Sequence, residues 1–184
     1  WLKHLGVAVI ATAGGKEKCA RAKSLGADHV IDYTAENFTA RVKEITNGKG
    51  VPVVYDGVGK ATFEASLDCL ARRGMLVSFG AASCAVPPFA PALLSQKGSL
   101  YLTRPTLGHY TATRGGLEES AADLFDVVAS GAVRIDIGQT FALKDAAKFS
   151  GHSLRVGFAV TAAEAGATIE QIALITRHRS LEMP

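Results

Sequence analysis

The chain of 184 residues is long enough for one ordinary domain with a short appendage, and its 48% hydrophobic content supports a sizeable core. Its formal net charge of +3 neither indicates nor excludes nucleic acid, and no apolar run approaches the ~20 residues of a membrane span. Three widely spaced cysteines without a C-x-x-C pair exclude a structural zinc cluster and indicate a reducing, cytoplasmic setting.

Strand and helix patterns alternate along the first part of the chain. A nearly continuous apolar run over residues 7–13 is typical of a strand buried on both faces, and Gly14-Gly15 predicts a turn after it. The predicted elements that follow are a helix over 16–25, a strand over 29–33, and a helix with Thr34 as its cap and an apolar stripe at Phe38, Val42 and Ile45.

The segment from Val51 to Gly80 reads as a strand–helix–strand unit. β-Branched and aromatic residues over 51–55 predict the first strand, which ends at Asp56 and the glycines after it. Helical spacing from Phe63 to Leu70, closed by basic residues and a glycine at 72–74, predicts the helix. Residues 75–79 predict the second strand, and such units almost always form right-handed parallel crossovers.

The alternation continues to about residue 147 and then stops. The later predicted elements are a proline-rich loop over 81–91, a helical turn at 92–96, a strand at 99–103, a helix opened by Gly115-Gly116 and closed by Gly131, an edge strand at 133–141 and a helix from Lys144. The pattern predicts an α/β fold with a doubly wound parallel sheet over residues 1–147. Residues 148–184 predict a basic helical appendage with helices at 152–165 and 168–177.

The residues that follow each strand are the candidates for ligand binding, because a doubly wound sheet binds its ligand at the carboxyl ends of its strands. No acid that could accept a bond from a ribose 2′-hydroxyl occurs between Val7 and Lys16, whereas Lys16 and Lys18 could neutralise a 2′-phosphate. This charge pattern favours NADP over NAD, although lysines at a helix start are also ordinary solvated surface. Tyr33 could reach an adenine ribose or phosphate, or it could cap the core.

Long phrases of the sequence resemble one family of enzymes. They are VVYDGVG at 53–59, SLDCLARRG at 66–74, VSFG at 77–80 and QKGSLYLTRP at 96–105. These phrases are similar to zinc-independent quinone oxidoreductases of the zeta-crystallin type, in the medium-chain dehydrogenase/reductase superfamily, over residues 1 to about 147. The resemblance implies a Rossmann-type domain that binds NADPH, hydride transfer to quinones or α,β-unsaturated carbonyls, a homodimer and no catalytic zinc.

The resemblance also implies which residues contact the cofactor. It places Gly14 and Lys18 at the 2′-phosphate, with Tyr33 beside them. The other implied contacts are Phe79, Gly80, Ala82, Ser83, Cys84 and Ala85 near the nicotinamide ribose, and Thr103 and Arg104 beside the nicotinamide. It implies a dimer seam near the strand Ser99–Thr103, and it implies no single catalytic acid or base.

The start of the chain departs from the family pattern. Residues 1–6 read like the last turns of a helix, and the glycine-rich phosphate loop that precedes this helix in the family, like the amino-terminal domain, is missing from the sequence. We therefore expect a partial Rossmann-type sheet that lacks its first strand and exposes strand edges in its middle. Without the helix N-terminus that holds the pyrophosphate, we expect NADPH to bind weakly or not at all.

The tail over residues 149–180 resembles the end of the catalytic domain of tyrosine recombinases. His152 and Arg155 match the H-x-x-R box, and His178 matches the later histidine. The tyrosine nucleophile that the family places about nine residues later is missing, so we expect no DNA cleavage, and DNA is a partner only if the tail functions. Three hypotheses follow: a quinone oxidoreductase that is inactive as this chain, a non-catalytic binding or structural remnant, and a protein that associates with DNA through its tail.

Overall fold

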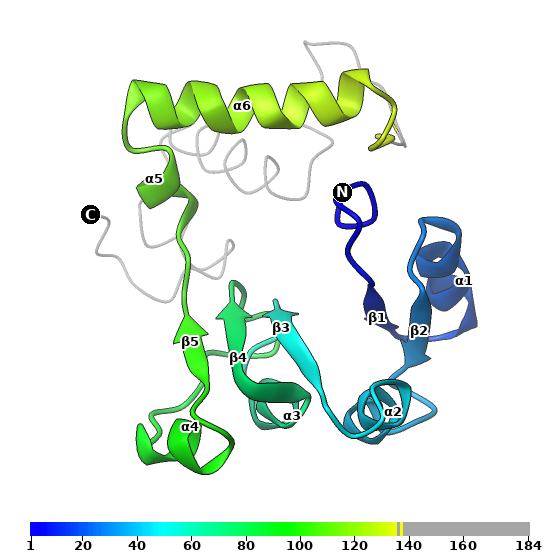
Figure 1. Cartoon of the computed structure of the whole chain (residues 1–184), viewed down its shortest axis with the longest axis vertical. Helices are drawn as coiled ribbons and strands as arrows, with labels where there is room; N and C mark the ends of the chain where they lie inside the picture. Colours follow the sequence, from blue (N-terminus) through cyan, green and yellow to red (C-terminus); the bar gives the residue numbers. More distant parts are fainter. Residues whose placement is uncertain (136, 138–184) are drawn as a thin grey trace, which may run out of the picture. The chain divides into compact units, whose positions relative to one another are not determined.

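The computed structural model of the chain describes residues 1–135 and 137. The chain divides into two units, Trp1–Arg134 and Ile135–Pro184, and strands alternate with helices along the first unit (Figure 1). In chain order the elements are β1 (Ile10–Ala13), α1 (Lys16–Ser24), β2 (His29–Asp32), α2 (Phe38–Ile45), β3 (Val51–Asp56), α3 (Phe63–Asp68), β4 (Leu70–Ser78), α4 (Ala92–Gln96), β5 (Tyr101–Thr103), α5 (Leu107–Tyr110) and α6 (Arg114–Ala129). The helices predicted from Lys144 onward lie outside the described residues.

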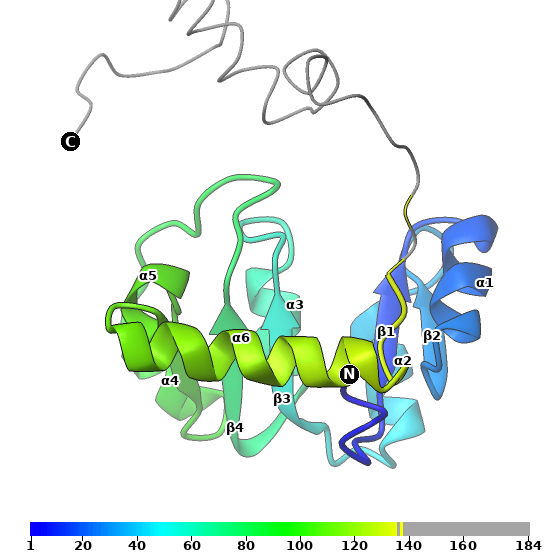
Figure 2. The same ribbon diagram turned by 90° about the horizontal axis from the view of Figure 1, so that it is seen from above.

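All strand pairs of the described chain are parallel, but they form two sheets rather than one. β1 pairs with β2, and β3, β4 and β5 form a second sheet in that order. No described strand lies between β1 and β3, which are the neighbouring edges of the two sheets in Figures 1 and 2. The α/β class and the parallel pairing are as predicted, and the interruption lies beside β1, where a strand is expected to be missing.

Among the described residues, helices and loops cover only one face of the second sheet. Leu76 is fully buried and lies in register with Leu102, on the face that packs against α3. On the opposite face, Val53, Met75 and Tyr101 form one row across the three strands and remain 38–50% exposed. Together with Tyr55, these three residues define what we call the uncovered face, because successive side chains of a strand point to opposite faces.

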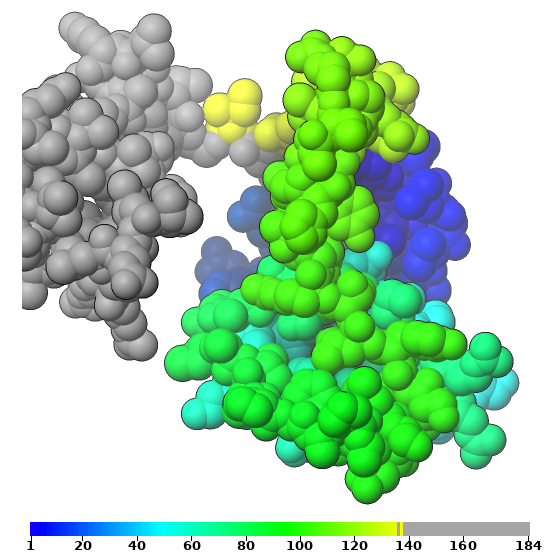
Figure 3. Space-filling view, turned by 90° about the vertical axis from the view of Figure 1, so that its left-hand side faces the viewer, coloured from blue at the N-terminus to red at the C-terminus, as the bar shows by residue number. Residues whose placement is uncertain are grey.

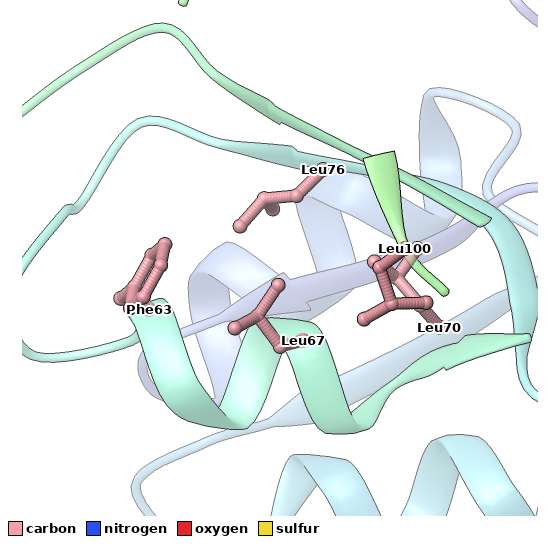
Figure 4. Close-up of a cluster of buried hydrophobic side chains, with 5 residues drawn as sticks. All are labelled: Phe63, Leu67, Leu70, Leu76 and Leu100. Atoms are coloured by element: carbon pink, nitrogen blue, oxygen red, sulfur yellow. The ribbon is translucent and has the colours of Figure 1, made fainter. Parts of the chain in front are cut away.

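Two clusters of hydrophobic side chains make up the core. The first lies between α3 and the second sheet and contains Phe63, Leu67, Leu70, Leu76 and Leu100 (Figure 4). The second forms around Ile31, Val42 and Cys69, and Ile10 of β1 and Val51 and Val54 of β3 pack against it. Because the second cluster takes side chains from both sheets and from α2, it connects the two sheets although their strands are not paired.

Two helix boundaries differ from the prediction. Thr34 does not cap α2; the helix begins at Phe38, and the side chain of Asn37 accepts a hydrogen bond from the Ala40 N–H as the actual N-cap. The predicted helix from Phe63 through Leu70 is also wrong in its end, because α3 stops at Asp68 and β4 begins at Leu70. Pairing with the start of β3 ends this helix early.

The remaining elements follow the prediction with local changes. The hydrogen bonds from Gly6 N–H to the Lys3 carbonyl and from Val7 N–H to the Leu2 carbonyl form a helical C-terminal cap, so β1 begins only at Ile10. The helix opened by Gly115-Gly116 is α6, while α5 was not predicted. The strand predicted at 133–141 is absent from residues 133–135, and most of its other positions lie outside the described residues.

Candidate functional site

The end of β1 places a tyrosine over a glycine. A Cβ atom added at Gly14 would lie 2.7 Å from the Tyr33 hydroxyl oxygen, so a larger residue there would displace this exposed ring. The Tyr33 side chain is exposed, and no described residue hydrogen-bonds its hydroxyl. Lys16 and Lys18, in the first turn of α1, are exposed, and Lys18 has no ion-pair partner among the described residues. This corner therefore offers a phenol and two cations to an anion.

Asp32 holds the turns at this corner in place. Its Oδ1 atom accepts hydrogen bonds from the Gly15 N–H at 3.0 Å, the Thr34 N–H at 3.0 Å and the Thr34 hydroxyl at 2.6 Å. The Thr34 hydroxyl and the two backbone N–H groups lower the pKa of the Asp32 carboxyl. The carboxylate thus joins the end of β2 to the glycine turn after β1.

Asp56, which is buried, holds the turn at the end of β3 in place. Its Oδ1 accepts from the N–H groups of Val58 and Gly59, and its Oδ2 accepts from the hydroxyls of Thr62 and Ser66, at 2.7–3.0 Å. Burial is the largest single influence and raises the pKa of the Asp56 carboxyl, but the four hydrogen bonds together outweigh it and lower the pKa. The charged carboxylate therefore shapes the β3–α3 turn.

The loops that follow β3 and β4 are joined along their length. Ala82 N–H donates to the Gly57 carbonyl, and both the N–H and the hydroxyl of Ser83 donate to the Val58 carbonyl. A Cβ atom at Gly80 would lie 2.3 Å from the Gly57 carbonyl oxygen, so the close contact of these loops requires glycine at position 80. The Phe79 ring lies against Gly57, and more than half of its surface remains exposed.

A cavity of about 550 Å³ opens beside these loops, at the carboxyl ends of β4 and β5. Its walls are mainly apolar, and the Phe63 and Phe89 rings pack 5.0 Å apart between their centroids. Arg104 is its one charged lining residue, and its Nη1 atom donates to the carbonyls of Ser78 at 2.7 Å and Gly80 at 3.1 Å. The Nε and Nη2 atoms of Arg104 bond to no described residue, so they remain free to bind an oxygen atom of a ligand.

The predicted site residues fall into two groups in the structure. Gly14, Tyr33 and Lys18 lie together at the end of β1, β2 and the start of α1. Gly80, Ala85 and Arg104 line the cavity, whereas Phe79, Ala82, Ser83, Cys84 and Thr103 do not. Ala82, Ser83 and Cys84 instead bind the neighbouring loop through backbone and hydroxyl hydrogen bonds. His152, Arg155 and His178 lie outside the described residues.

Sequence reasoning missed the two aspartates and part of the cavity wall. Asp32 and Asp56 both end a strand just before a turn, and this position was the available signal for a carboxylate that binds turn N–H groups. Phe63 was predicted only as part of a helix, and Phe89 as part of an irregular loop, yet both line the cavity.

Within the described part of the chain, no group of three or more His, Cys, Asp or Glu side chains is arranged to hold a metal ion. Nor does that part contain a helix long and apolar enough to cross a membrane.

Comparison with known proteins links this geometry to one family of enzymes. The family model described as zinc-binding dehydrogenase matches residues 1–126. The chain is 53% identical over 148 residues to a quinone oxidoreductase of Salmonella typhimurium, a match that covers 79% of this chain and 45% of that protein. The chain thus spans less than half the length of this relative.

Solved structures of the same kind share the fold. The quinone oxidoreductase of Pseudomonas syringae is 47% identical and superposes with a TM-score of 0.76, covering 85% of this chain and 47% of that one. The Escherichia coli quinone oxidoreductase in complex with NADPH is 49% identical, with a TM-score of 0.73, and the match covers 75% of this chain and 42% of that one.

Proposed function

Because the chain belongs to the zinc-binding dehydrogenase family, we propose that it forms the NADPH-binding part of a quinone oxidoreductase in the cytoplasm. In this function, NADPH donates a hydride to a quinone or to an α,β-unsaturated carbonyl compound, without zinc. The proposal names no catalytic residue in this chain, because the proposed role of the described residues is to bind and orient the cofactor.

The observation that carries the proposal is the corner at the end of β1. A cofactor with a 2′-phosphate needs cations and hydrogen-bond donors there, whereas NAD requires an acid for the free 2′-hydroxyl. Lys18 and the Tyr33 hydroxyl have no described partner, and the acid that lies nearby, Asp32, already accepts three hydrogen bonds. These features suit a phosphate better than a hydroxyl.

The cavity beside β4 and β5 fits the other end of the cofactor and the substrate ring. Its apolar walls suit a flat ring, and the free nitrogen atoms of Arg104 suit a carbonyl or carboxamide oxygen. The loops after β3 and β4 form one side of this cavity through Gly80 and Ala85.

By itself, the chain is proposed to bind NADPH weakly or not at all. Among the described residues, we assign no helix N-terminus to the pyrophosphate. Each hydrogen bond to a charged group that is not made costs roughly 1.5–3 kcal/mol of binding free energy. An isothermal titration of the isolated chain with a micromolar dissociation constant for NADPH would contradict this.

A chimera tests the proposed function even if the isolated chain binds NADPH weakly. Residues 1–147 of this chain would replace the matched segment of the Salmonella typhimurium relative. We expect the chimera to oxidise NADPH with a quinone, to prefer NADPH over NADH and to keep its activity after dialysis against a chelator. Lys18→Glu should reduce the preference at least tenfold by placing a negative charge beside the phosphate, while the exposed control Lys49→Glu should not. A folded chimera that prefers NADH would refute the cofactor assignment.

The proposed assembly is a homodimer through the outer edge of β5. β5 pairs only with β4 among the described strands, and Figure 3 views the molecule from the β5 side. Tyr101 of β5 is 50% exposed. We expect sedimentation to show a dimer that Tyr101→Lys weakens and Tyr110→Lys, a more exposed control on α5, leaves intact. A monomer at all concentrations would rule out this assembly.

A further inference from the structure

One edge of the Arg104 guanidinium is free. Its Nη1 atom carries two N–H groups, and these donate to the carbonyls of Ser78 at 2.7 Å and Gly80 at 3.1 Å. The N–H groups of Nε and Nη2, which lie parallel along the neighbouring edge of the guanidinium, bond to no described residue. Two parallel N–H groups form the fork that binds both oxygen atoms of one carboxylate.

The positive charge of Arg104 has no counter-charge among the described residues. No described acid forms an ion pair with it, and no acid lines the cavity of about 550 Å³ beside it. A neutral carbonyl oxygen would use the free N–H groups but leave the charge uncompensated, whereas a carboxylate supplies two acceptor atoms and the opposite charge. Because Nη1 already anchors the guanidinium, little side-chain entropy is lost when an anion binds.

The interior of the cavity is apolar and lies on the α3 side of the second sheet. Leu102 is in register with Leu76, and the buried side chain of Leu76 belongs to the same cluster as Phe63 at the start of α3 (Figure 4). Phe63, Phe89 and Leu102 line the cavity, and the centroids of the two phenyl rings lie 5.0 Å apart. A flat apolar ring is stabilised by burial against such walls, whereas a small hydrophilic anion is not.

Arg104 meets both the cavity and the solvent. The residue is exposed, whereas Phe63 is buried and Phe89 is half-buried. An anion bound to Arg104 therefore keeps part of its hydration, which avoids the high free-energy cost of burying a charge. The cavity volume of about 550 Å³ lies within the range of roughly 300–1,000 Å³ that is typical of small-molecule pockets. A ligand with a ring at one end and a carboxylate at the other matches both parts of this site.

We propose that the cavity binds ring compounds that carry a carboxylate, with the ring beside Phe63 and Phe89 and the carboxylate on the free edge of Arg104. The preferred substrate is then a quinone or a cyclic enone with a carboxylate side chain. That this compound is a substrate rests on the proposed function, whereas its binding to the chain does not. The carboxylate is unchanged in the reaction, in which the ring gains a hydride from the cofactor and a proton from solvent while the cofactor is oxidised. Arg104 thus determines specificity and takes no part in the chemistry.

Titration of the whole chain with naphthoate and with naphthamide tests binding without the cofactor. The two probes share one ring system and differ in charge. We expect naphthoate to bind about tenfold more tightly, the gain from a charge-assisted pair of hydrogen bonds that solvent partly screens. Backbone nuclear magnetic resonance signals of Gly80, Ala85 and Leu102 should shift during the titration, because these residues line the cavity. Equal affinity for the two probes, or shifts that leave these residues unchanged, would overturn the carboxylate site.

Two variants of Arg104 test its part in the preference, and circular dichroism checks that each is folded. Arg104→Gln removes the charge and the fork, so the two probes should bind about equally; an unchanged preference would overturn Arg104 as the ligand. Arg104→Lys keeps the charge without the fork and should lower the preference to about threefold. If Arg104→Gln does not fold, an undiminished preference in Arg104→Lys would overturn the bidentate contact. The matched control is Arg72→Gln, because Arg72 is exposed near the start of β4, has no described ion-pair partner and does not line the cavity.

Turnover by the chimera separates this site from the proposed function. The substrates are a naphthoquinone with a propanoate side chain and its methyl ester, which share one ring. We expect a KM about tenfold lower for the acid with a similar kcat, because the carboxylate contact is the same in the ground and transition states, and Arg104→Gln should abolish the difference. An active chimera with equal KM values would overturn the carboxylate preference and leave the enzyme assignment standing. An inactive chimera, together with a chain that prefers naphthoate, would refute the proposed function and leave the binding site standing.

Discussion

Replacement of Asp56 tests the claim that one buried carboxylate organises the turn beside the cavity. The residue is 5% exposed and accepts hydrogen bonds from four donors, two of them buried, the Gly59 N–H and the Ser66 hydroxyl. Asp56→Ala leaves these donors without an acceptor, at a cost of roughly 1–3 kcal/mol for each that finds no other partner. Because hydroxyls can turn to a new acceptor, we expect a total loss of about 3 kcal/mol in the free energy of unfolding.

The variant Asp56→Asn separates shape from charge. Its carbonyl oxygen can still accept from the Val58 and Gly59 N–H groups, and its amide can donate to the two hydroxyls, so the loss should be about 1 kcal/mol. Urea unfolding followed by circular dichroism measures both values. Asp123→Asn, an exposed change on α6, is the matched control and should have no effect.

The pH dependence decides whether the charge matters. Since the folded pKa of Asp56 lies below the unfolded value of about 3.9, its charge stabilises the fold above that value, and this contribution is lost as the pH falls through the folded pKa. The stability difference between the wild-type chain and Asp56→Asn should therefore be constant near neutral pH and shrink below about pH 4. A difference that stays the same down to pH 3 would refute a stabilising carboxylate.

Three further substitutions test the packing by the same urea measurement. Gly80→Ala should destabilise the chain by about 2 kcal/mol or more, because its Cβ would lie 2.3 Å from a backbone oxygen of the loop after β3, whereas Gly108→Ala meets no atom within 4 Å and should be neutral. Asn37→Ala should cost about 1 kcal/mol by removing the N-cap of α2, and Asn37→Gly only a few tenths. Leu76→Ala should cost about 3 kcal/mol, against less than about 1 kcal/mol for Met75→Ala on the exposed side of the same strand.

Local patterns predicted most elements because they depend on neighbouring residues. Apolar runs located the strands, and α1 begins directly after the predicted turn at Gly14-Gly15. The helix predicted to open at Gly115-Gly116 is α6, which begins one residue earlier, at Arg114. The errors at Thr34 and Leu70 share one cause. At both positions a competing contact outweighs local propensity. Thr34 bonds to Asp32 instead of capping α2, and Leu70 pairs with β3 instead of continuing α3. Periodicity along the sequence does not reveal either contact.

The candidate site shows the same division. Charge along the chain was enough to select Lys18 as a phosphate ligand candidate, the position after a strand selected Tyr33, and the resemblance supplied Gly14. Only the folded structure shows that Tyr33 lies against Gly14. It also shows that Asp32 and Asp56 accept hydrogen bonds from turn N–H groups. Hydrogen-bond partners depend on where a turn folds back, and spacing in the sequence does not specify that.

The sequence by itself determined the α/β class, the family resemblance and the expectation of an interrupted sheet, because periodicity and long shared phrases are local properties of the chain. Only the tertiary structure decided that β1–β2 and β3–β4–β5 form separate sheets connected by the core around Ile31 and Val42. It also decided that Arg104 lies in an apolar cavity with two nitrogen atoms free. Strand pairing and cavity walls are made by residues far apart in the chain, and their free energies depend on contacts that form only when the chain folds.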